Sequence, residues 1–197
     1  MFDVARLRED VTFEAELRGQ PLRFASRFGL FSPREVDEGT RLLLDHLDVR
    51  RADDCLDLGC GYGPIGITMA KLAPEGATVL VDRDVVAVEY ARRNVELNAL
   101  ANAEVLLGDG FRGLEGRRFD LVASNLPAKA GNEALYLLLA DARASLRPGG
   151  RCAVVTLSGM RRFIERALVE LFGNYEKVKQ GRTHTVSLAV VEGEPSQ

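Results

Sequence analysis

A run of closely spaced glycines at residues 57–66, DLGCGYGPIG, constrains the fold of this chain more than any other feature. The run follows a short apolar segment, CLDL, and leads into a segment of helical character, PIGITMAKLA. Glycine permits the positive φ of a tight turn and leaves the backbone open to a ligand at the helix N-terminus. The pattern therefore predicts a strand, a ligand-binding turn and a helix in direct succession.

The rest of the chain continues this alternation of strands and helices. Strands are expected at residues 55–58, 77–82, 103–108, 119–125, 151–157 and 183–192, and helices at 64–73, 84–98, 131–146 and 160–172. Alternating segments of this kind form a mostly parallel sheet with right-handed crossovers and helices on both faces. We expect a doubly wound α/β domain at residues 26–197, within the usual length of one domain.

The N-terminal segment has a different pattern. Residues 11–17 alternate apolar and polar side chains, residues 19–21 break the run, and residues 22–24 resume it. This pattern predicts a β-hairpin, and we assign residues 1–25 to a hairpin extension of the domain. Ser32-Pro33 with Glu35 has the signature of a helix start, so a helix is expected from there to about Leu47.

Composition excludes several classes of protein. With 46% hydrophobic and 28% charged residues, the chain is neither disordered nor of low complexity. It has no signal-peptide pattern and no run of about 20 apolar residues, so a cytoplasmic protein without a membrane segment is expected. Cys55, Cys60 and Cys152 lack C-x-x-C spacing, and His46 and His184 are the only histidines. These residues favour neither disulfides nor a metal site.

The small net charge of -3 conceals an asymmetry along the chain. Residues 53–140 contain 8 basic and 13 acidic side chains, whereas residues 141–182 contain 9 basic and 4 acidic ones. A basic surface attracts polyanions such as nucleic acids, although a solvated arginine-rich helix face gives the same count. The second segment is where we expect a polyanion to approach.

An acid after the second expected strand of the α/β domain adds to the glycine signal. Asp82 lies 16 residues after Gly66, where a carboxylate accepts hydrogen bonds from ribose hydroxyls. The two features together predict a nucleoside-cofactor site. They leave both nicotinamide dinucleotides and S-adenosylmethionine open, but the chain has no obvious Tyr-Lys or His-Asp arrangement for hydride chemistry.

The segment from Asp57 to Gly63 resembles the acidic glycine loop of class I S-adenosylmethionine-dependent methyltransferases. LRPGG at residues 146–150 is similar to the turn before their fifth strand. The resemblance implies a seven-stranded, mostly parallel Rossmann-like sheet with an antiparallel C-terminal strand, and S-adenosylmethionine as the cofactor. The cofactor-binding residues that it implies in this part of the chain are Asp57, Gly59, Cys60, Gly61, Gly63, Asp82, Arg83, Asp109, Gly110 and Asn125.

The segment after the fourth strand of the domain, Asn125-Leu126-Pro127-Ala128, resembles the N-P-P-aromatic motif of methyltransferases that act on exocyclic or amide nitrogens. An amino group conjugated to a purine is a poor nucleophile, so its lone pair must be aimed at the methyl group. The side-chain oxygen of Asn125 and the carbonyl of Leu126 would accept its two N–H bonds, and Pro127 would hold that carbonyl outward. We take these three residues as the catalytic candidates.

The chain departs from this motif at two positions. Leu126 replaces the first proline, and Ala128 replaces the aromatic residue on which a target base would stack. Base stacking is worth about 1–3 kcal/mol, so another group must replace it or the acceptor is not a flipped base. The aromatic residues considered as replacements are Phe24, Phe28, Phe31 and Phe111, each of which is also a plausible core residue.

Residues 24–191 resemble the small-domain (MTS) methyltransferases related to the ribosomal small-subunit RNA guanine-N2 enzymes. The resemblance rests on FGLFS at 28–32, VDEGT at 36–40, the glycine loop, NLPAKAGNE at 125–133 and Gly181-Arg182. It implies that Phe31 and Ser32 edge the cofactor pocket, and that Ala128, Lys129 and Arg182 meet the substrate.

The expected activity is methylation of guanine N2 in ribosomal or other structured RNA, with no metal and no membrane partner. Two alternatives stay open: the same cofactor with a protein-amide or small-molecule acceptor, and a non-catalytic S-adenosylmethionine-binding module. The sequence leaves the oligomeric state open as well.

Overall fold

The structure, a computed structural model, describes residues 4–5 and 9–193. Parts of the predicted hairpin extension, residues 1–3 and 6–8, lie outside the described residues. The last four residues of the predicted domain, 194–197, lie outside them as well.

The described chain contains a two-stranded sheet and a seven-stranded sheet. The strands are β1 (Asp10–Leu17), β2 (Gln20–Arg27), β3 (Cys55–Leu58), β4 (Thr78–Asp82), β5 (Ala103–Leu107), β6 (Phe119–Asn125), β7 (Leu146–Leu157), β8 (Glu176–Gln180) and β9 (His184–Val190). In the larger sheet the order is β5-β4-β3-β6-β7-β9-β8, and β9 runs antiparallel to both of its neighbours. This confirms the predicted fold class, including the antiparallel C-terminal strand.

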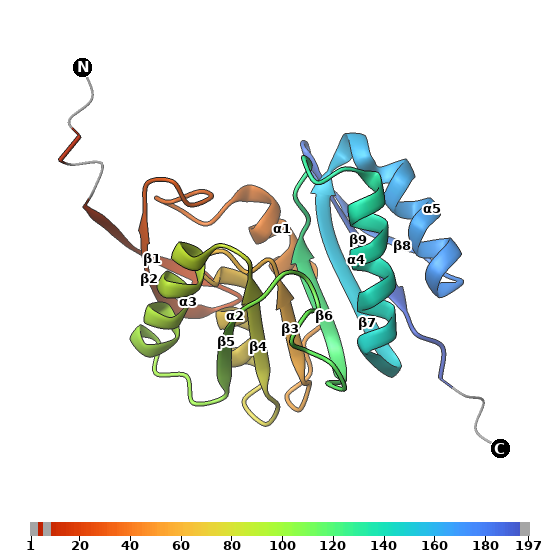
Figure 1. Ribbon diagram of the computed structural model, residues 1–197, viewed down its shortest axis with the longest axis horizontal. Helices are drawn as coiled ribbons and strands as arrows, with labels where there is room; N and C mark the ends of the chain where they lie inside the picture. Colours follow the sequence, from red (N-terminus) through yellow and green to blue (C-terminus); the bar gives the residue numbers. More distant parts are fainter. Residues whose placement is uncertain (1–3, 6–8, 194–197) are drawn as a thin grey trace.

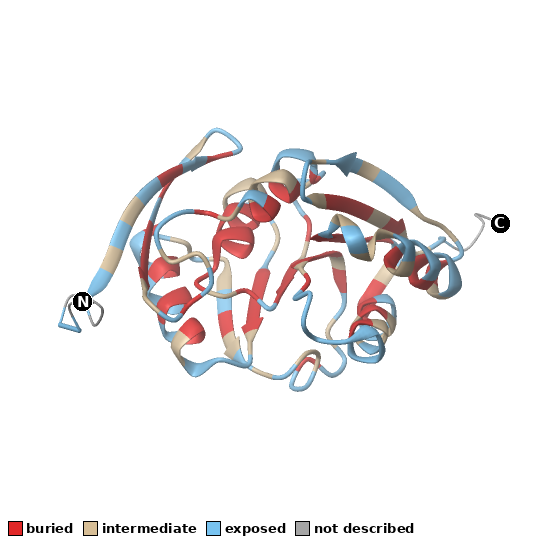
Figure 2. Ribbon diagram, turned by 90° about the horizontal axis from the view of Figure 1, so that it is seen from above, coloured by how far each residue is buried: buried red, intermediate tan, exposed pale blue. Residues whose placement is uncertain are grey.

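Helices cover both faces of the large sheet (Figure 1). The helices are α1 (Glu38–His46), α2 (Pro64–Leu72), α3 (Val85–Leu97), α4 (Asn132–Ser145), α5 (Arg161–Phe172) and a 3-10 turn at Ser158–Met160. Helices α1 to α3 pack on one face, and α4 and α5 pack on the other, so the strands between them are mostly buried (Figure 2). Alternate side chains of β3 supply both layers: Cys55 packs in the layer of α1 to α3, and Leu56 packs in the layer of α4 and α5.

The hairpin β1–β2 packs against α3 and the glycine loop. Asn94 of α3 is fully buried, and its side chain accepts a hydrogen bond from the Ala25 N–H at 2.7 Å and donates to the Ala25 carbonyl at 2.8 Å. The side chain of Asn98 likewise accepts from the Arg23 N–H and donates to the Arg23 carbonyl. Phe24 joins the core on this face. The hairpin is therefore fixed to the main sheet through a helix, and the division at residue 25 stays a prediction.

The predicted helix start at Ser32-Pro33 is wrong. The helix α1 begins at Glu38, and its N-cap is Asp37, whose carboxylate accepts from Gly39 N and Thr40 N at 2.9 and 3.1 Å. Ser32 has a left-handed φ of 47°, which no helix continues. An aspartate cap with glutamate in the first turn is a stronger start signal than the serine upstream.

Strand β8 was not predicted from the sequence. Its five residues, EKVKQ, are polar except for Val178, and they form the edge of the sheet beside β9. Charged side chains, lysine above all, protect edge strands from pairing with other chains, and they also hide the period-2 pattern. None of the helices among the described residues is long and apolar enough to cross a membrane.

Candidate active site

Parallel strands bring most of the predicted site residues to one edge of the sheet. Leu58 at the end of β3 pairs with Val81 of β4, and Asp82 pairs with Leu107 of β5. On the other side of β3 lies β6, which ends at Asn125. Ligand sites of open α/β sheets form at the carboxyl ends of the strands, where the order of strands reverses, here between β3 and β6.

The glycine loop has the backbone that the sequence predicted. Gly59, Gly61 and Gly63 have φ of 72°, 58° and 98°. A Cβ added at Gly59 or Gly61 would meet no atom within 4 Å, so open space lies over these two residues. A Cβ at Gly66 would lie 2.4 Å from Leu80, so this glycine lets α2 approach β4. The first two glycines leave room for a ligand, and the last serves packing.

The N–H groups of this loop are already bonded within the protein. Gly59 and Cys60 donate to the Val81 carbonyl, Gly63 donates to the Cys60 carbonyl, and Gly61 donates to Asp82 Oδ2 at 2.8 Å. A dinucleotide diphosphate would need such donors to be free. The loop instead presents backbone to a ligand without phosphate, which fits S-adenosylmethionine better than a nicotinamide cofactor.

Asp57 is a buried acid beneath the glycine loop. Its side chain is fully buried, Oδ2 accepts from the Gly66 N–H at 2.7 Å, and Oδ1 has no hydrogen-bond partner in the described part of the chain. Burial raises the pKa of Asp57 to about 7, the Gly66 N–H lowers it, and the charge of Asp82 raises it further. A buried acceptor without a partner is costly, and a cationic ligand would relieve that cost. The residues present therefore fit S-adenosylmethionine, a cation with an amino-acid end.

The other predicted cofactor residues lie around this loop. Asp82 ends β4, is half-buried, and accepts from Gly61 N and Asp84 N, which leaves lone pairs for ribose hydroxyls. Arg83 and Asp109 are exposed on the loops after β4 and β5. The side chain of Cys60, by contrast, packs in the core.

Gly110 has a φ of 64°, and a Cβ there would lie 3.1 Å from Leu138 of α4. The loop after β5 therefore packs closely on α4 at this point.

Tyr62, inside the glycine loop, connects it to the segment that carries Phe31 and Ser32. The Tyr62 hydroxyl donates to the carbonyls of Ser32 and Glu35 at 3.3 and 3.1 Å. Phe31 itself is 68% exposed. The segment is thus held beside the loop while its aromatic side chain stays free.

Asn125 is held by the N-terminus of α1. Its Nδ2 donates to Asp37 Oδ2 at 3.0 Å and to Thr40 Oγ1 at 3.1 Å. A carboxylate accepts only, so the amide nitrogen must face Asp37 and the amide oxygen must face away. The oxygen accepts no hydrogen bond from the described residues, so it is available to an incoming N–H.

Asp37 and Thr40 are functional candidates that the sequence interpretation missed. They lie 88 and 85 residues from Asn125 along the chain, so no local pattern joins them. The usable signal was the helix cap: the polar residue immediately before a helix is a rigid acceptor, and this helix begins beside the site. We assign Asp37 a positioning role.

The contacts of Leu126 explain why leucine replaces the first proline of the motif. Its N–H donates to the Val155 carbonyl at 3.0 Å, a bond that proline lacks, and its side chain is buried in the layer of α4 and α5. Pro127, Ala128 and Lys129 are exposed, and the Pro127 carbonyl accepts from Ala130 N. The backbone therefore turns outward immediately after Leu126.

Arg182 lies in the turn between β8 and β9, which reaches the same region through α1. Thr183 Oγ1 donates to Glu38 Oε2 at 3.2 Å, and a Cβ at Gly39 would lie 2.7 Å from the His184 ring. Arg182 itself is exposed. The turn thus borders the helix end that holds Asn125.

The four aromatic residues considered as replacements for the stacking residue of the motif differ in how far their rings are exposed. Phe24 is a core residue, 1% exposed, and Phe28 is half-buried with the Arg34 guanidinium 4.9 Å from its ring centre. Phe111 packs partly against the layer of α4 and α5. Only Phe31 among the four leaves its ring exposed.

The cysteines are buried thiols. Burial raises the pKa of Cys55 and of Cys152 to about 12, and that of Cys60 well above its usual value. No group of three or more metal-ligating side chains occurs among residues 4–5 and 9–193.

Comparison with known proteins places these features in a family. The chain is 30% identical over 179 residues to YbxB of Bacillus subtilis, an uncharacterised protein, covering 89% of both chains. It is 37% identical over 153 residues to ribosomal RNA small subunit methyltransferase C of Pseudomonas entomophila, covering 76% of this chain and 46% of that one. It spans about half the length of such methyltransferases.

A solved structure matches the fold of nearly the whole chain. The T. thermophilus 16S rRNA N2 G1207 methyltransferase, RsmC, solved with AdoMet and guanosine, is 30% identical, with a TM-score of 0.83 over 94% of this chain and 51% of that one. Residues 21–187 match the methyltransferase small domain family. The chain therefore belongs to this family of S-adenosylmethionine-dependent methyltransferases.

Proposed function

We propose that this protein transfers methyl from S-adenosylmethionine to the exocyclic N2 of a guanine in ribosomal or other structured RNA. The observation that carries the proposal is the Asn125 amide, which Asp37 and Thr40 hold by its nitrogen so that its oxygen faces away from them. The relatives that act on rRNA, and the RsmC structure with guanosine, support the same acceptor. An rRNA substrate also agrees with the cytoplasmic location expected from the sequence.

The cofactor residues proposed are those around the glycine loop. Open space over Gly59 and Gly61 would admit the ligand, the charge of Asp57 buried beneath the loop would attract its cationic part, and Asp82 would accept from ribose hydroxyls. When bound, S-adenosylmethionine supplies a methyl group made electrophilic by the attached sulfonium.

The acceptor residues act by orienting the guanine amine. The Asn125 amide oxygen and the Leu126 carbonyl would accept the two N–H bonds of the guanine amine, which fixes the plane of the amine and aims its lone pair. Both acceptors are neutral, so they do not act as strong bases. The proton that the amine releases on gaining a methyl group passes to solvent at the exposed loop beginning with Pro127.

A protein-amide acceptor is the second candidate, and Ala128 favours it. This position has no ring to support a base, and an amide has the same N–H geometry as the guanine amine. Phe31, exposed on the other side of the loop region, is the available platform in the RNA proposal.

The test is transfer of labelled methyl to RNA and, in parallel, to ribosomal proteins from cells that lack this protein, with digestion of the RNA and mass spectrometry of its nucleosides. We expect a new N2-methylguanosine that wild-type protein forms and Asn125→Ala does not. Label in a ribosomal protein but none in RNA would reject the RNA proposal in favour of the amide acceptor.

A further inference from the structure

A basic pocket lies beyond the candidate active site, at the end of β7. Six residues line it: Ser158, Gly159, Arg161, Arg162, Lys177 and Gln180. They come from the 3-10 turn, the first turn of α5 and the edge strand β8, and they enclose a cavity of about 470 Å³. Three of the six carry a positive charge and none carries a negative one.

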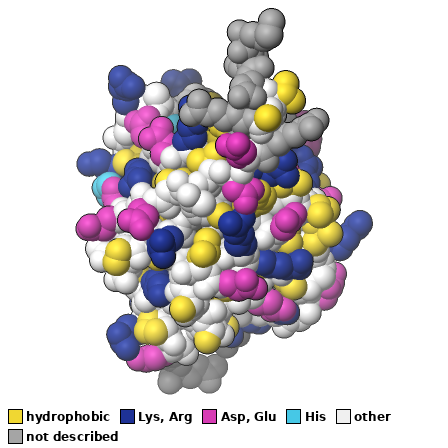
Figure 3. Space-filling model, turned by 90° about the vertical axis from the view of Figure 1, so that its left-hand side faces the viewer, with side chains coloured by type: hydrophobic (Ala, Val, Ile, Leu, Met, Phe, Trp, Pro, Cys, Tyr) yellow, Lys and Arg dark blue, Asp and Glu magenta, His cyan; other side chains and the backbone are white. Residues whose placement is uncertain are grey.

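The cations of this pocket differ from several arginines elsewhere in the chain, which form ion pairs. Arg161, Arg162 and Lys177 form no ion pair within the described residues. Elsewhere, Arg93 pairs with Asp10 and Arg117 pairs with Glu104. On the face of the hairpin and α3, basic and acidic side chains are interspersed (Figure 3). The pocket therefore concentrates positive charge that the fold itself does not use.

The floor of the pocket supplies neutral hydrogen-bonding groups. Gln180 Nε2 donates to Ser158 Oγ at 2.9 Å, and Ser158 Oγ lies 3.3 Å from Thr185 Oγ1. None of the lining side chains is aromatic or large and apolar. This chemistry suits a phosphodiester with its flanking hydroxyls and gives an apolar peptide segment nothing to bury.

The pocket lies a short distance along β7 from the strand position that pairs with Asn125. Asn125 pairs with Val155 on β7, and Ser158 follows three residues later, about 10 Å farther along at a rise of about 3.3 Å per residue. Ser158 N also donates to the Thr183 carbonyl, in the turn that contacts α1. An RNA strand with one base at Asn125 would pass the pocket with an adjacent part of its backbone.

We infer that this pocket binds the phosphate backbone of the RNA next to the target nucleotide. The inference rests on the proposed function and adds to it a second, sequence-independent contact that guides the strand to the site. It also assigns a use to the excess of basic residues in the C-terminal part of the chain.

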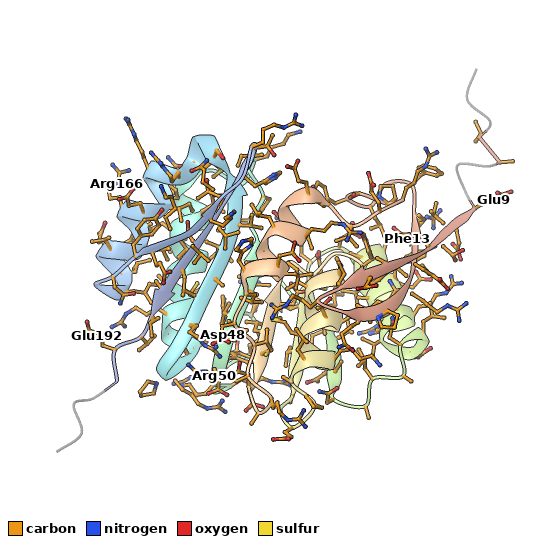
Figure 4. The ribbon with its side chains drawn as sticks, turned by 180° about the vertical axis from the view of Figure 1, so that it is seen from behind. Glu9, Phe13, Asp48, Arg50, Arg166 and Glu192 are labelled. Atoms are coloured by element: carbon orange, nitrogen blue, oxygen red, sulfur yellow. The ribbon has the colours of Figure 1, made fainter. Side chains whose placement is uncertain are left out.

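The test uses the full chain with Arg162→Gln and Lys177→Gln together. The control that removes the same number of charges is Arg50→Gln with Arg51→Gln. These two exposed arginines before β3 lie at the amino ends of the parallel strands, far from the pocket, and pair with Asp48 and Glu75; Arg50 is labelled in Figure 4. The probe is a fluorescein-labelled single-stranded RNA of 12 nucleotides, and its dissociation constant is measured by anisotropy over a series of salt concentrations. S-adenosylmethionine binding is measured in parallel to show that each variant is folded.

We expect the pocket variant to bind the RNA roughly tenfold more weakly at low salt, with a salt slope smaller by about 1.4, because each lost phosphate contact removes about 0.7 from the slope. The control variant should match the wild type in slope. S-adenosylmethionine affinity should not change in either variant.

Equal affinity and slope in the wild type and the pocket variant would overturn the inference and leave the proposed methyl transfer standing. Polyglutamate that displaced the RNA at equal charge concentration would overturn it too, because the pocket would then be a general anion site. Pocket-dependent RNA binding without any methyl transfer to RNA would support the pocket and contradict the proposed function.

Discussion

The cofactor side and the acceptor side of this site differ in how completely the fold satisfies their polar groups. Around the glycine loop, backbone N–H groups bond to Val81, Cys60 and Asp82, and the buried Asp57 Oδ1 stands without a partner. On the acceptor side, the loop from Pro127 onward is exposed, and the cations beyond it are unpaired. In the proposed function, the first side would bind one small cation in a largely fixed loop, and the second would present an open surface to a large anion.

This difference indicates which side of the site determines substrate specificity. A loop whose donors are bonded within the protein is held in one conformation, so it is preorganised for its ligand. An exposed loop and an edge strand vary freely without disturbing the core. We expect changes on the cofactor side to abolish binding of the small molecule, and changes on the acceptor side to alter rate or RNA affinity alone.

The largest effect on S-adenosylmethionine affinity is expected at Asp57. Asp57→Asn keeps the hydrogen bond to the Gly66 N–H but removes the negative charge, so S-adenosylmethionine affinity should fall by at least about 100-fold, the equivalent of about 2.7 kcal/mol. Isothermal titration calorimetry measures the change. The exposed acid Asp45→Asn serves as a control of equal charge. Unchanged S-adenosylmethionine affinity in Asp57→Asn would show that the charge of Asp57 does not contribute to cofactor binding.

Asp37→Ser tests the acceptor side separately from the cofactor side, because Asp37 acts on the acceptor side only. Serine still caps α1 but is too short to reach Asn125, so the rate of methyl transfer should fall about 30-fold while S-adenosylmethionine affinity stays the same. Asp37→Asn, which keeps an acceptor of the same length, should restore most of the rate. A loss of cofactor affinity equal to the loss of rate would show that Asp37 supports the whole fold and not the orientation of one amide.

Phe31→Ala should weaken RNA binding more than it weakens cofactor binding. If its exposed ring stacks on the target base, its loss costs about 1–3 kcal/mol, and the KM for RNA should rise about tenfold. Phe31→Tyr should keep the wild-type KM. A larger rise in the KM for S-adenosylmethionine than for RNA would assign Phe31 to the cofactor side.

The smallest effect is a pH dependence of stability without cofactor. The pKa of Asp57 is raised from 3.8 to about 7 in the folded chain, so the folded protein binds this proton more tightly than the unfolded one. The associated stability is complete below about pH 4 and is lost as the pH rises through about 7. At pH 8, Asp57→Asn should therefore be more stable than the wild type.

Thermal unfolding at pH 4 and pH 8 measures this difference. The advantage of Asp57→Asn should be small at pH 4 and larger at pH 8. An advantage of the same size at both values would mean that the carboxyl does not titrate in this range.

Local patterns were sufficient to predict the fold and the glycine loop. The turn at Gly59 to Gly63 needs residues that are neighbours in sequence, and the parallel strands carry continuous apolar runs. Strand β8 escaped prediction because an edge strand buries little, and its charges mask the alternation of Val178 with its neighbours.

The contacts that complete the site join distant parts of the chain, which is why the sequence did not reveal them. Asn125 meets Asp37 across 88 residues, and Asn94 bridges Ala25 and Tyr62 across 69 and 32 residues. Polar residues such as these are usually surface residues, and only tertiary packing distinguishes the buried ones.

The most direct measurement is a single-turnover assay of methyl transfer to RNA by Asn125→Ala at saturating S-adenosylmethionine. If the amide orients the acceptor nitrogen, the rate should fall by at least about 1,000-fold, equivalent to about 4 kcal/mol, while the dissociation constant of S-adenosylmethionine changes less than about threefold. A rate within about threefold of the wild type would contradict the division of this site into a cofactor side and an orienting acceptor side.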